Sequence, residues 1–130
     1  MRDEIAAAHR RLDALFEGAR EALARGVPEA ARRVLAELQE ALADHFEQED
    51  RLYYPAIGSL RPEHRDSVER FATDHGRFLD QLERVAERVR ARSLADAARA
   101  FEDFALDFAG HEAGEEALLE ALRVEVEAAG

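Results

Sequence analysis

The sequence has no cysteine, no lysine, three prolines and no long uninterrupted apolar run. Without cysteine the chain can form no disulfide, no thiolate nucleophile and no zinc–thiolate site. No segment approaches the roughly 20 apolar residues that a membrane-spanning helix needs. The segment from Met1 to Ile5 leads into an amphipathic stretch and not into the apolar region of a secretory signal, so we expect a cytoplasmic protein.

Acidic residues outnumber basic ones, 29 to 18, so the formal net charge is -11. A protein that binds nucleic acid needs a basic surface to neutralise the phosphates, and this composition argues against one. The same excess of carboxylates disfavours binding to anionic membrane surfaces. We therefore expect neither nucleic acid nor membrane among the partners.

Alanine, leucine, glutamate and arginine dominate the 130 residues, and this composition favours an all-α fold. Apolar residues recur at helical spacing in four segments. The predicted helices run from Asp3 to Arg25, from Pro28 to Tyr54, from Pro62 to the turn at Ser93, and from Ser93 onward. Since all three connections are short, we expect residues 1–130 to form a single antiparallel up-down-up-down four-helix bundle.

Proline and glycine mark the expected breaks between these helices. Gly26 should end the first helix, and Pro28 suits the first turn of the second. Pro55 should end the second helix, because its ring cannot continue the hydrogen-bond ladder. Ser93 with Asp96 forms a capping box that would open the fourth helix.

Two histidines stand four residues before a glutamate, in the pairs His45 and Glu49 and His111 and Glu115. Residues four apart on a helix share one face, so each pair offers an imidazole and a carboxylate to the same region. His9 and His75 stand alone on the other two predicted helices. Together the two pairs and the two single histidines could hold two metal ions inside a bundle.

The four histidines are also expected at one height in the bundle. In an antiparallel hairpin, two residues lie level when their midpoint falls in the turn. The midpoints between successive histidines are Val27, Leu60 and Ser93, and all three lie in predicted breaks. Each histidine also occupies a position of its helix where an apolar core residue is expected.

A single histidine on an apolar face is usually a core residue whose nitrogens find ordinary partners. Four histidines at one level with two carboxylates are different, because buried carboxylates without a partner are costly. Cations between the helices would satisfy all six groups. The pattern therefore favours a metal site over a metal-free interaction bundle, which remains the alternative.

These motifs resemble the hemerythrin-like family, also described as HHE cation-binding domains. The resemblance spans nearly the whole chain and rests on the order single His, His-x3-Glu, single His, His-x3-Glu. It implies a non-haem centre of two iron ions, bridged by carboxylates, with an oxo, hydroxo or water ligand. By the resemblance, His9 and His45 hold one iron, His75 and His111 hold the other, and Glu49 and Glu115 bridge them.

The chain departs from the oxygen-carrying members at two positions. They have a fifth histidine where this sequence has Phe71, so one iron would lack a ligand. Their last bridging carboxylate follows its histidine by five residues, a position that Glu116 occupies here; we prefer Glu115, because a five-residue step rotates the side chain by about 140°. Tyr53, one turn after Glu49, could fill the open position, unless it and Tyr54 pack at the bundle end with their hydroxyls in water.

Other side chains could support such a centre. Asp107 lies one turn before His111 and could orient its imidazole, although a surface position is equally consistent with the spacing. Four phenylalanines lie close in sequence to the predicted ligands and could form an apolar wall or simply pack in the core. They are Phe46, Phe71, Phe78 and Phe108.

Imidazole and carboxylate ligands with an open position suit iron better than magnesium or structural zinc. The first hypothesis is a di-iron protein that binds or reacts with dioxygen, peroxide or nitric oxide; as an enzyme it would have a catalase-like or other oxidoreductase activity. The second is an iron- or oxygen-responsive sensor or storage protein without turnover. The third is the metal-free bundle.

Overall fold

The computed structural model describes the backbone of residues 2–129 and the side chains of residues 3–123. All regular secondary structure in this part of the chain is helical. The elements are α1 (Arg2–Arg25), α2 (Pro28–Gln48), the π-helical turn η1 (Glu49–Tyr53), α3 (Tyr54–Leu60), the 3-10 turn η2 (Pro62–His64), α4 (Arg65–Arg90) and α5 (Leu94–Ala129). None of these helices is both long enough and apolar enough to cross a membrane.

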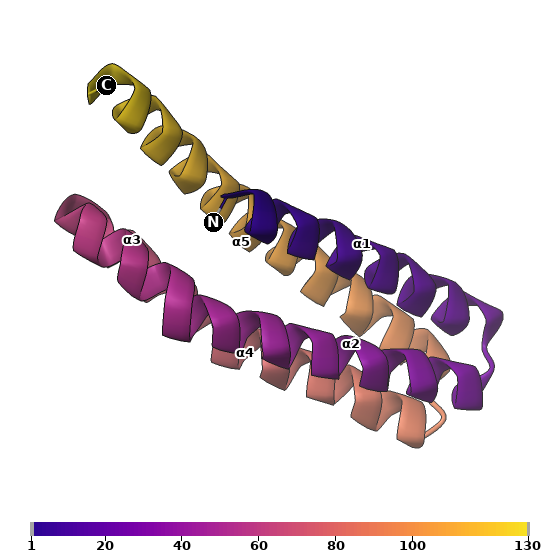
Figure 1. Cartoon of the computed structure of the whole chain (residues 1–130). Coiled ribbons are helices and arrows are strands. Elements are labelled where there is room, and N and C mark those ends of the chain that lie inside the picture. The colour runs from indigo at the N-terminus through magenta and orange to yellow at the C-terminus, as the bar shows by residue number, and fades with distance from the viewer. Residues whose placement is uncertain (1, 130) are drawn as a thin grey trace.

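The helices pack antiparallel, which confirms the predicted four-helix bundle. α1 packs against α2, α2 against α4, α4 against α5, and α5 against α1, so the four rods close into a ring around one interior. The α1–α2 and α4–α5 turns lie together at one end of the bundle, and the N-terminus and α3 lie toward the other (Figure 1). α5 runs on beyond the start of α1 (Figure 1).

Two of the predicted breaks lie where the sequence places them. Gly26 follows α1 with a φ of 70°, a left-handed conformation that glycine adopts without steric cost, and Pro28 begins α2. The second break separates α4 from α5, which begins at Leu94, directly after Ser93. These short turns set α1 against α2 and α4 against α5.

Pro55 does not end the second helix, so this prediction was wrong. The helix widens into the π-helical turn η1, in which the Tyr54 amide donates to the Glu49 carbonyl five residues back. Pro55 then lies in the first turn of α3, where a missing amide hydrogen leaves no helical bond unmade. The chain leaves the helical conformation only at Arg61.

Two apolar clusters fill the interior. The larger lies toward the α1–α2 and α4–α5 turns and includes Leu12, Phe46, Phe78 and Phe108. The smaller lies toward α3 and consists of Ile5, Tyr54, Ile57, Val68, Leu118 and Leu119. His9, between Ile5 and Leu12 on α1, marks the height at which a polar layer separates the two clusters.

Candidate metal centre

Six polar side chains are buried in this layer, and they are the six predicted ligands. α1 contributes His9, α4 contributes His75, and α2 with η1 contributes His45 and Glu49. His111 and Glu115 come from α5, and none of the six is more than 6% exposed. The helical periodicity therefore directs the imidazoles and carboxylates inward from all four rods, as the spacing predicts.

Glu49 lies between two histidines of neighbouring helices. Its Oε2 is 3.4 Å from Nε2 of His45, and its Oε1 is 3.1 Å from Nε2 of His75. The Glu49 side chain is fully buried. One carboxylate thus faces both halves of the polar layer.

Glu115 lies across from Glu49 and spans the other two helices. Its Oε1 is 3.1 Å from Nε2 of His111 and 3.6 Å from Nε2 of His9. The neighbouring Glu116 has a side chain that is 59% exposed and contacts the outer nitrogen of His9. α5 is a regular α-helix here, so the four-residue step from His111 points inward and the five-residue step points outward.

The donor atoms fall into two groups within which all atoms lie within 4.8 Å of one another. The four-donor group consists of His9, His45, Glu49 and Glu115. The three-donor group consists of Glu49, His75 and His111. Glu49 belongs to both, so it is the carboxylate best placed to link two cations.

Most of the inward-facing atoms have no hydrogen-bond partner among the described residues. They are Nε2 of His9, His45 and His111, both carboxylate oxygens of Glu49, and Oε1 of Glu115. Leaving such atoms buried and unpaired costs free energy, and native proteins usually avoid it. A cation in each group would remove the cost, and imidazole with carboxylate suits iron, so the residues present fit the cofactor that the sequence predicts.

Carboxylates on the outer side orient three of the four imidazoles. Nδ1 of His9 is 3.2 Å from Glu116, and Nδ1 of His111 is 3.2 Å from Asp74. Nδ1 of His75 is 3.1 Å from Asp50, a close contact that lacks hydrogen-bond geometry. A carboxylate on the outer nitrogen turns the other nitrogen toward the interior and makes it a better ligand.

Asp74, and not Asp107, contacts His111. The carboxylate of Asp107 instead accepts hydrogen bonds from Arg77 and Gln81, each at 3.3 Å, on the outer side of the α4–α5 interface. Asp74 reaches His111 from the neighbouring helix, and no count along α5 could reveal this contact. The sequence carries no clear signal for it, because the position of Asp74 beside His75 does not say which residue of α5 its side chain meets.

Tyr54, and not Tyr53, lies at the centre. Its hydroxyl donates to Oε2 of Glu115 at 2.8 Å and lies 3.2 Å from Nε2 of His75, whereas the hydroxyl of Tyr53 donates to the surface residue Glu4 at 3.0 Å. The π-helical turn explains the difference, because it takes five residues, and not four, to return to the face of Glu49. The expectation that the Tyr54 hydroxyl lies in water is therefore also corrected.

Aromatic rings surround the histidines of the three-donor group. Phe46 stacks on His75 with ring centroids 4.0 Å apart, and Phe108 stacks on His111 at 5.9 Å. Phe71 and Phe78 meet His111 edge-on at 5.3 and 5.1 Å. All four phenylalanines predicted for the wall thus lie against an imidazole.

Phe71 has its place because of Gly114. A Cβ atom on Gly114 would lie 3.1 Å from Cε1 of Phe71, closer than ordinary contact. The absence of that atom lets the Phe71 ring lie against His111 at the position where the oxygen carriers have a fifth histidine. Phe71 supplies no donor there.

In the metal-free site the buried imidazoles and carboxylates shift one another's pKa values. Burial lowers the pKa of His9, but the carboxylate of Glu115, 3.6 Å from Nε2, and the hydrogen bond of Nδ1 to Glu116 outweigh it and raise this pKa to about 9. Burial is likewise outweighed by the nearby carboxylates of Glu115 and Asp74, which raise the pKa of His111. Burial is also outweighed by the imidazoles of His111 and His9, which lower the pKa of Glu115. Burial raises the pKa of Tyr54, so its hydroxyl keeps its proton.

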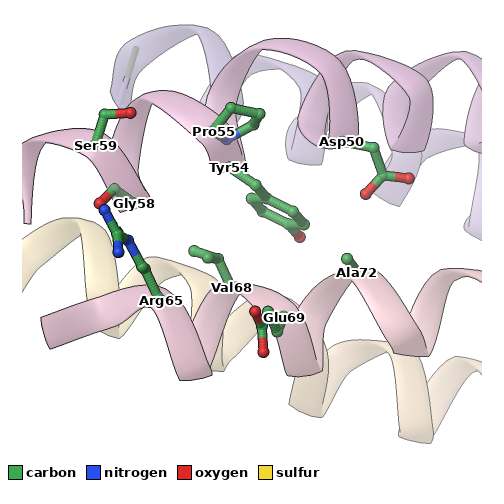
Figure 2. Close-up of a pocket in the computed structure, with 9 residues that line it drawn as sticks. All are labelled: Asp50, Tyr54, Pro55, Gly58, Ser59, Arg65, Val68, Glu69 and Ala72. Carbon is green, nitrogen blue, oxygen red and sulfur yellow. The ribbon is translucent and has the colours of Figure 1, made fainter. Parts of the chain in front are cut away.

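A surface pocket of about 440 Å³ lies over Tyr54, between α3 and α4. Figure 2 shows Tyr54 and Asp50 pointing into it from one side and Val68 and Ala72 from the other. Both Tyr54 and Asp50 contact His75 on their inner side. The pocket therefore brings solvent within one side chain of the three-donor group.

Comparisons with known proteins bear on this arrangement of donors. Residues 1–127 match the family described as Hemerythrin HHE cation binding domain. Neither the curated proteins nor the solved structures give a match. The family match covers all six buried donors, and the chain belongs to the hemerythrin HHE cation-binding domain family.

Proposed function

We propose that the chain holds two iron ions, one in each donor group, and binds or reacts there with dioxygen, peroxide or nitric oxide. The observation that carries this proposal is the set of buried donor atoms without partners. A metal-free interaction bundle would have to bear the cost of all these unpaired atoms in its core. We regard hydrogen peroxide decomposition as the first activity to test.

The three-donor group is the side at which an external ligand would bind. Phe71 contributes no donor there, so the protein offers one ligand fewer than in the four-donor group. When bound, a pair of iron ions supplies redox change and binding positions for a diatomic or peroxidic ligand. The aromatic rings around His75 and His111 would limit the access of water to that position.

Tyr54 has the right position to handle a proton beside this group. Its hydroxyl donates to Glu115 and lies next to Nε2 of His75. Because burial raises the pKa of Tyr54, the phenol stays protonated over the physiological range. Tyr54 would therefore donate a hydrogen bond to Glu115 or, after a small rotation, to a ligand in the three-donor group.

The experiment is to express the protein in iron-containing medium and to measure metal content, optical spectrum and peroxide consumption. We expect two iron atoms per chain, an absorption that changes with dioxygen or nitric oxide, and consumption of hydrogen peroxide. Protein stripped by a chelator is the control and should lose all three properties. Chains that take up no iron, or iron-loaded protein inert to all three molecules, would contradict the proposal.

A further inference from the structure

A groove of about 290 Å³ runs between α1 and α2 on the side of the four-donor group. Its lining includes Arg11, Ala41, Asp44, His45 and Gln48. His45 is the one predicted ligand among the lining residues, and the groove lies on a different face of the bundle from the pocket over Tyr54. It therefore reaches the polar layer from a different face.

His45 differs from the other three buried histidines in its outer nitrogen. Nδ1 of His9, His75 and His111 each lies within 3.2 Å of a carboxylate. Nδ1 of His45 has no hydrogen-bond partner in the part of the chain that the structure describes, although the side chain is only 5% exposed. Its ring can therefore turn about the Cβ bond without breaking a hydrogen bond.

The mouth of the groove carries oxygen donors. Asp44 and Gln48 are exposed, one residue before and three residues after His45. Neither makes a hydrogen bond or ion pair among the described contacts, so both are free to contact a cation. Arg11 lines the same groove and opposes the charge of Asp44.

We propose that this groove is the route by which a metal ion reaches and leaves the four-donor group, with His45 as the ligand that turns to admit it. The inference rests on the proposed function, because it concerns loading of the same site. The groove has room for a metal ion, and the carboxylate of Asp44 attracts the ion to its mouth. The imidazole of His45 can turn to let the ion pass, because none of the described residues holds its outer nitrogen by a hydrogen bond.

The face with the pocket over Tyr54 is less suited to this role. The imidazole of His75 lies between the ring of Phe46 and the hydroxyl of Tyr54, with Asp50 on its outer nitrogen. Turning His75 would disturb all three contacts. Ala72, in the pockets on that side, therefore offers a matched control for Ala41 in the groove.

The test measures uptake of Co²⁺ by the metal-free protein in a stopped-flow spectrometer, together with its release to a chelator. Ala41→Leu fills the groove, and we expect uptake to slow about tenfold, which corresponds to about 1.4 kcal/mol in the barrier. Release should slow by the same factor, because a higher barrier leaves the equilibrium unchanged. Ala72→Leu should leave both rates within about twofold of the parent rates, a much smaller change than the one expected for Ala41→Leu.

Charge at the mouth gives a second test that does not alter packing. Asp44→Asn should slow uptake about threefold at low ionic strength and Arg11→Gln should speed it, with both effects fading in high salt. The control Asp80→Asn, an exposed carboxylate on α4, should match the parent protein.

The outcomes separate the two proposals. If the parent protein binds no Co²⁺ at equilibrium, the proposed metal function fails. If it binds Co²⁺ and Ala41→Leu loads at the parent rate, or Ala72→Leu slows loading equally, the groove is not the route. Faster release from Ala41→Leu would show a damaged site and would also overturn the inference.

Discussion

The two halves of the polar layer are built differently. The half with His9 and His45 has four donors. In the described ring contacts, its two imidazoles meet each other, and His45 also meets Phe46 at 6.1 Å. The His75 and His111 half has three donors and lies among aromatic rings. We infer that the first half is suited to retain an ion and the second to present one to a ligand, with Glu49 joining them.

Glu49→Gln should have the largest effect, because it removes the one charge that both halves share. We expect the affinity for both ions to fall by more than about 100-fold, the upper end of the loss from a supporting contact. Metal titration followed by elemental analysis measures this. The control is Glu47→Gln, two residues away on the exposed side of the helix, where the described contact of Glu47 is with Arg51 at 4.0 Å. Two tightly held ions in Glu49→Gln would contradict the shared role.

The halves should respond unequally to loss of one histidine. His111→Ala leaves two donors in the three-donor group, so we expect about one tightly held ion per chain, consistent with the donor numbers that metal sites need. His9→Ala leaves three donors in each group, and we expect two ions with the affinity of one reduced. Isothermal titration with Co²⁺ gives the stoichiometry. Identical stoichiometries in the two variants would remove the distinction between the halves.

As pH rises, the stability of the metal-free fold should fall and the affinity of the site for metal should increase. The pKa of His9 rises from 6.5 to about 9 in the metal-free fold, so the protonated imidazole stabilises that fold fully below pH 6.5. This stabilisation, on the order of 3 kcal/mol, is lost as pH rises through 9. Metal affinity should instead increase over the same range, because protons leave the imidazoles.

Urea denaturation of the stripped protein and competition titrations at pH 6.5 to 9 test this pair of trends. His9→Gln should flatten the first trend. Burial also raises the pKa of Glu112 from 4.5 to about 7, so the metal-free fold should also lose stability as the pH rises through that lower range. Metal-free protein whose stability rose from pH 6.5 to 9 would exclude the role given to His9.

The smallest effect should come from the phenol of the three-donor half. Tyr54→Phe leaves Oε2 of Glu115 buried without its donor, which should cost the metal-free protein about 1 to 2 kcal/mol. Tyr53→Phe removes an exposed hydrogen bond to Glu4 and should cost nearly nothing. Chemical denaturation compares the two variants. Equal losses would show that the hydroxyl of Tyr54 has no special environment.

The sequence predicted the regular part of this molecule well. Apolar spacing located four helices, and the midpoints between histidines placed all four imidazoles in one layer. Both predictions depend only on a constant rise and rotation per residue, which regular α-helices provide. The inward position of Glu115, and the outward one of Glu116, follows from the same geometry on α5.

The prediction failed where that regularity ends. The π-helical turn shifts the face by one residue, and this shift exchanges Tyr53 for Tyr54. Pro55 was the signal, because a missing amide hydrogen must be accommodated either by a break or by a wider turn, and only tertiary packing decides which. Contacts between helices, such as Asp74 with His111, depend on how the rods are rotated against each other.

The close approach of Gly114 to Phe71 also limits how this sequence can evolve. A methyl group added at position 114 would press on the Phe71 ring, which would then have to shift by a few tenths of an ångström or be replaced by a smaller side chain. The side chains that positions 71 and 114 can hold are therefore coupled through this contact between α4 and α5.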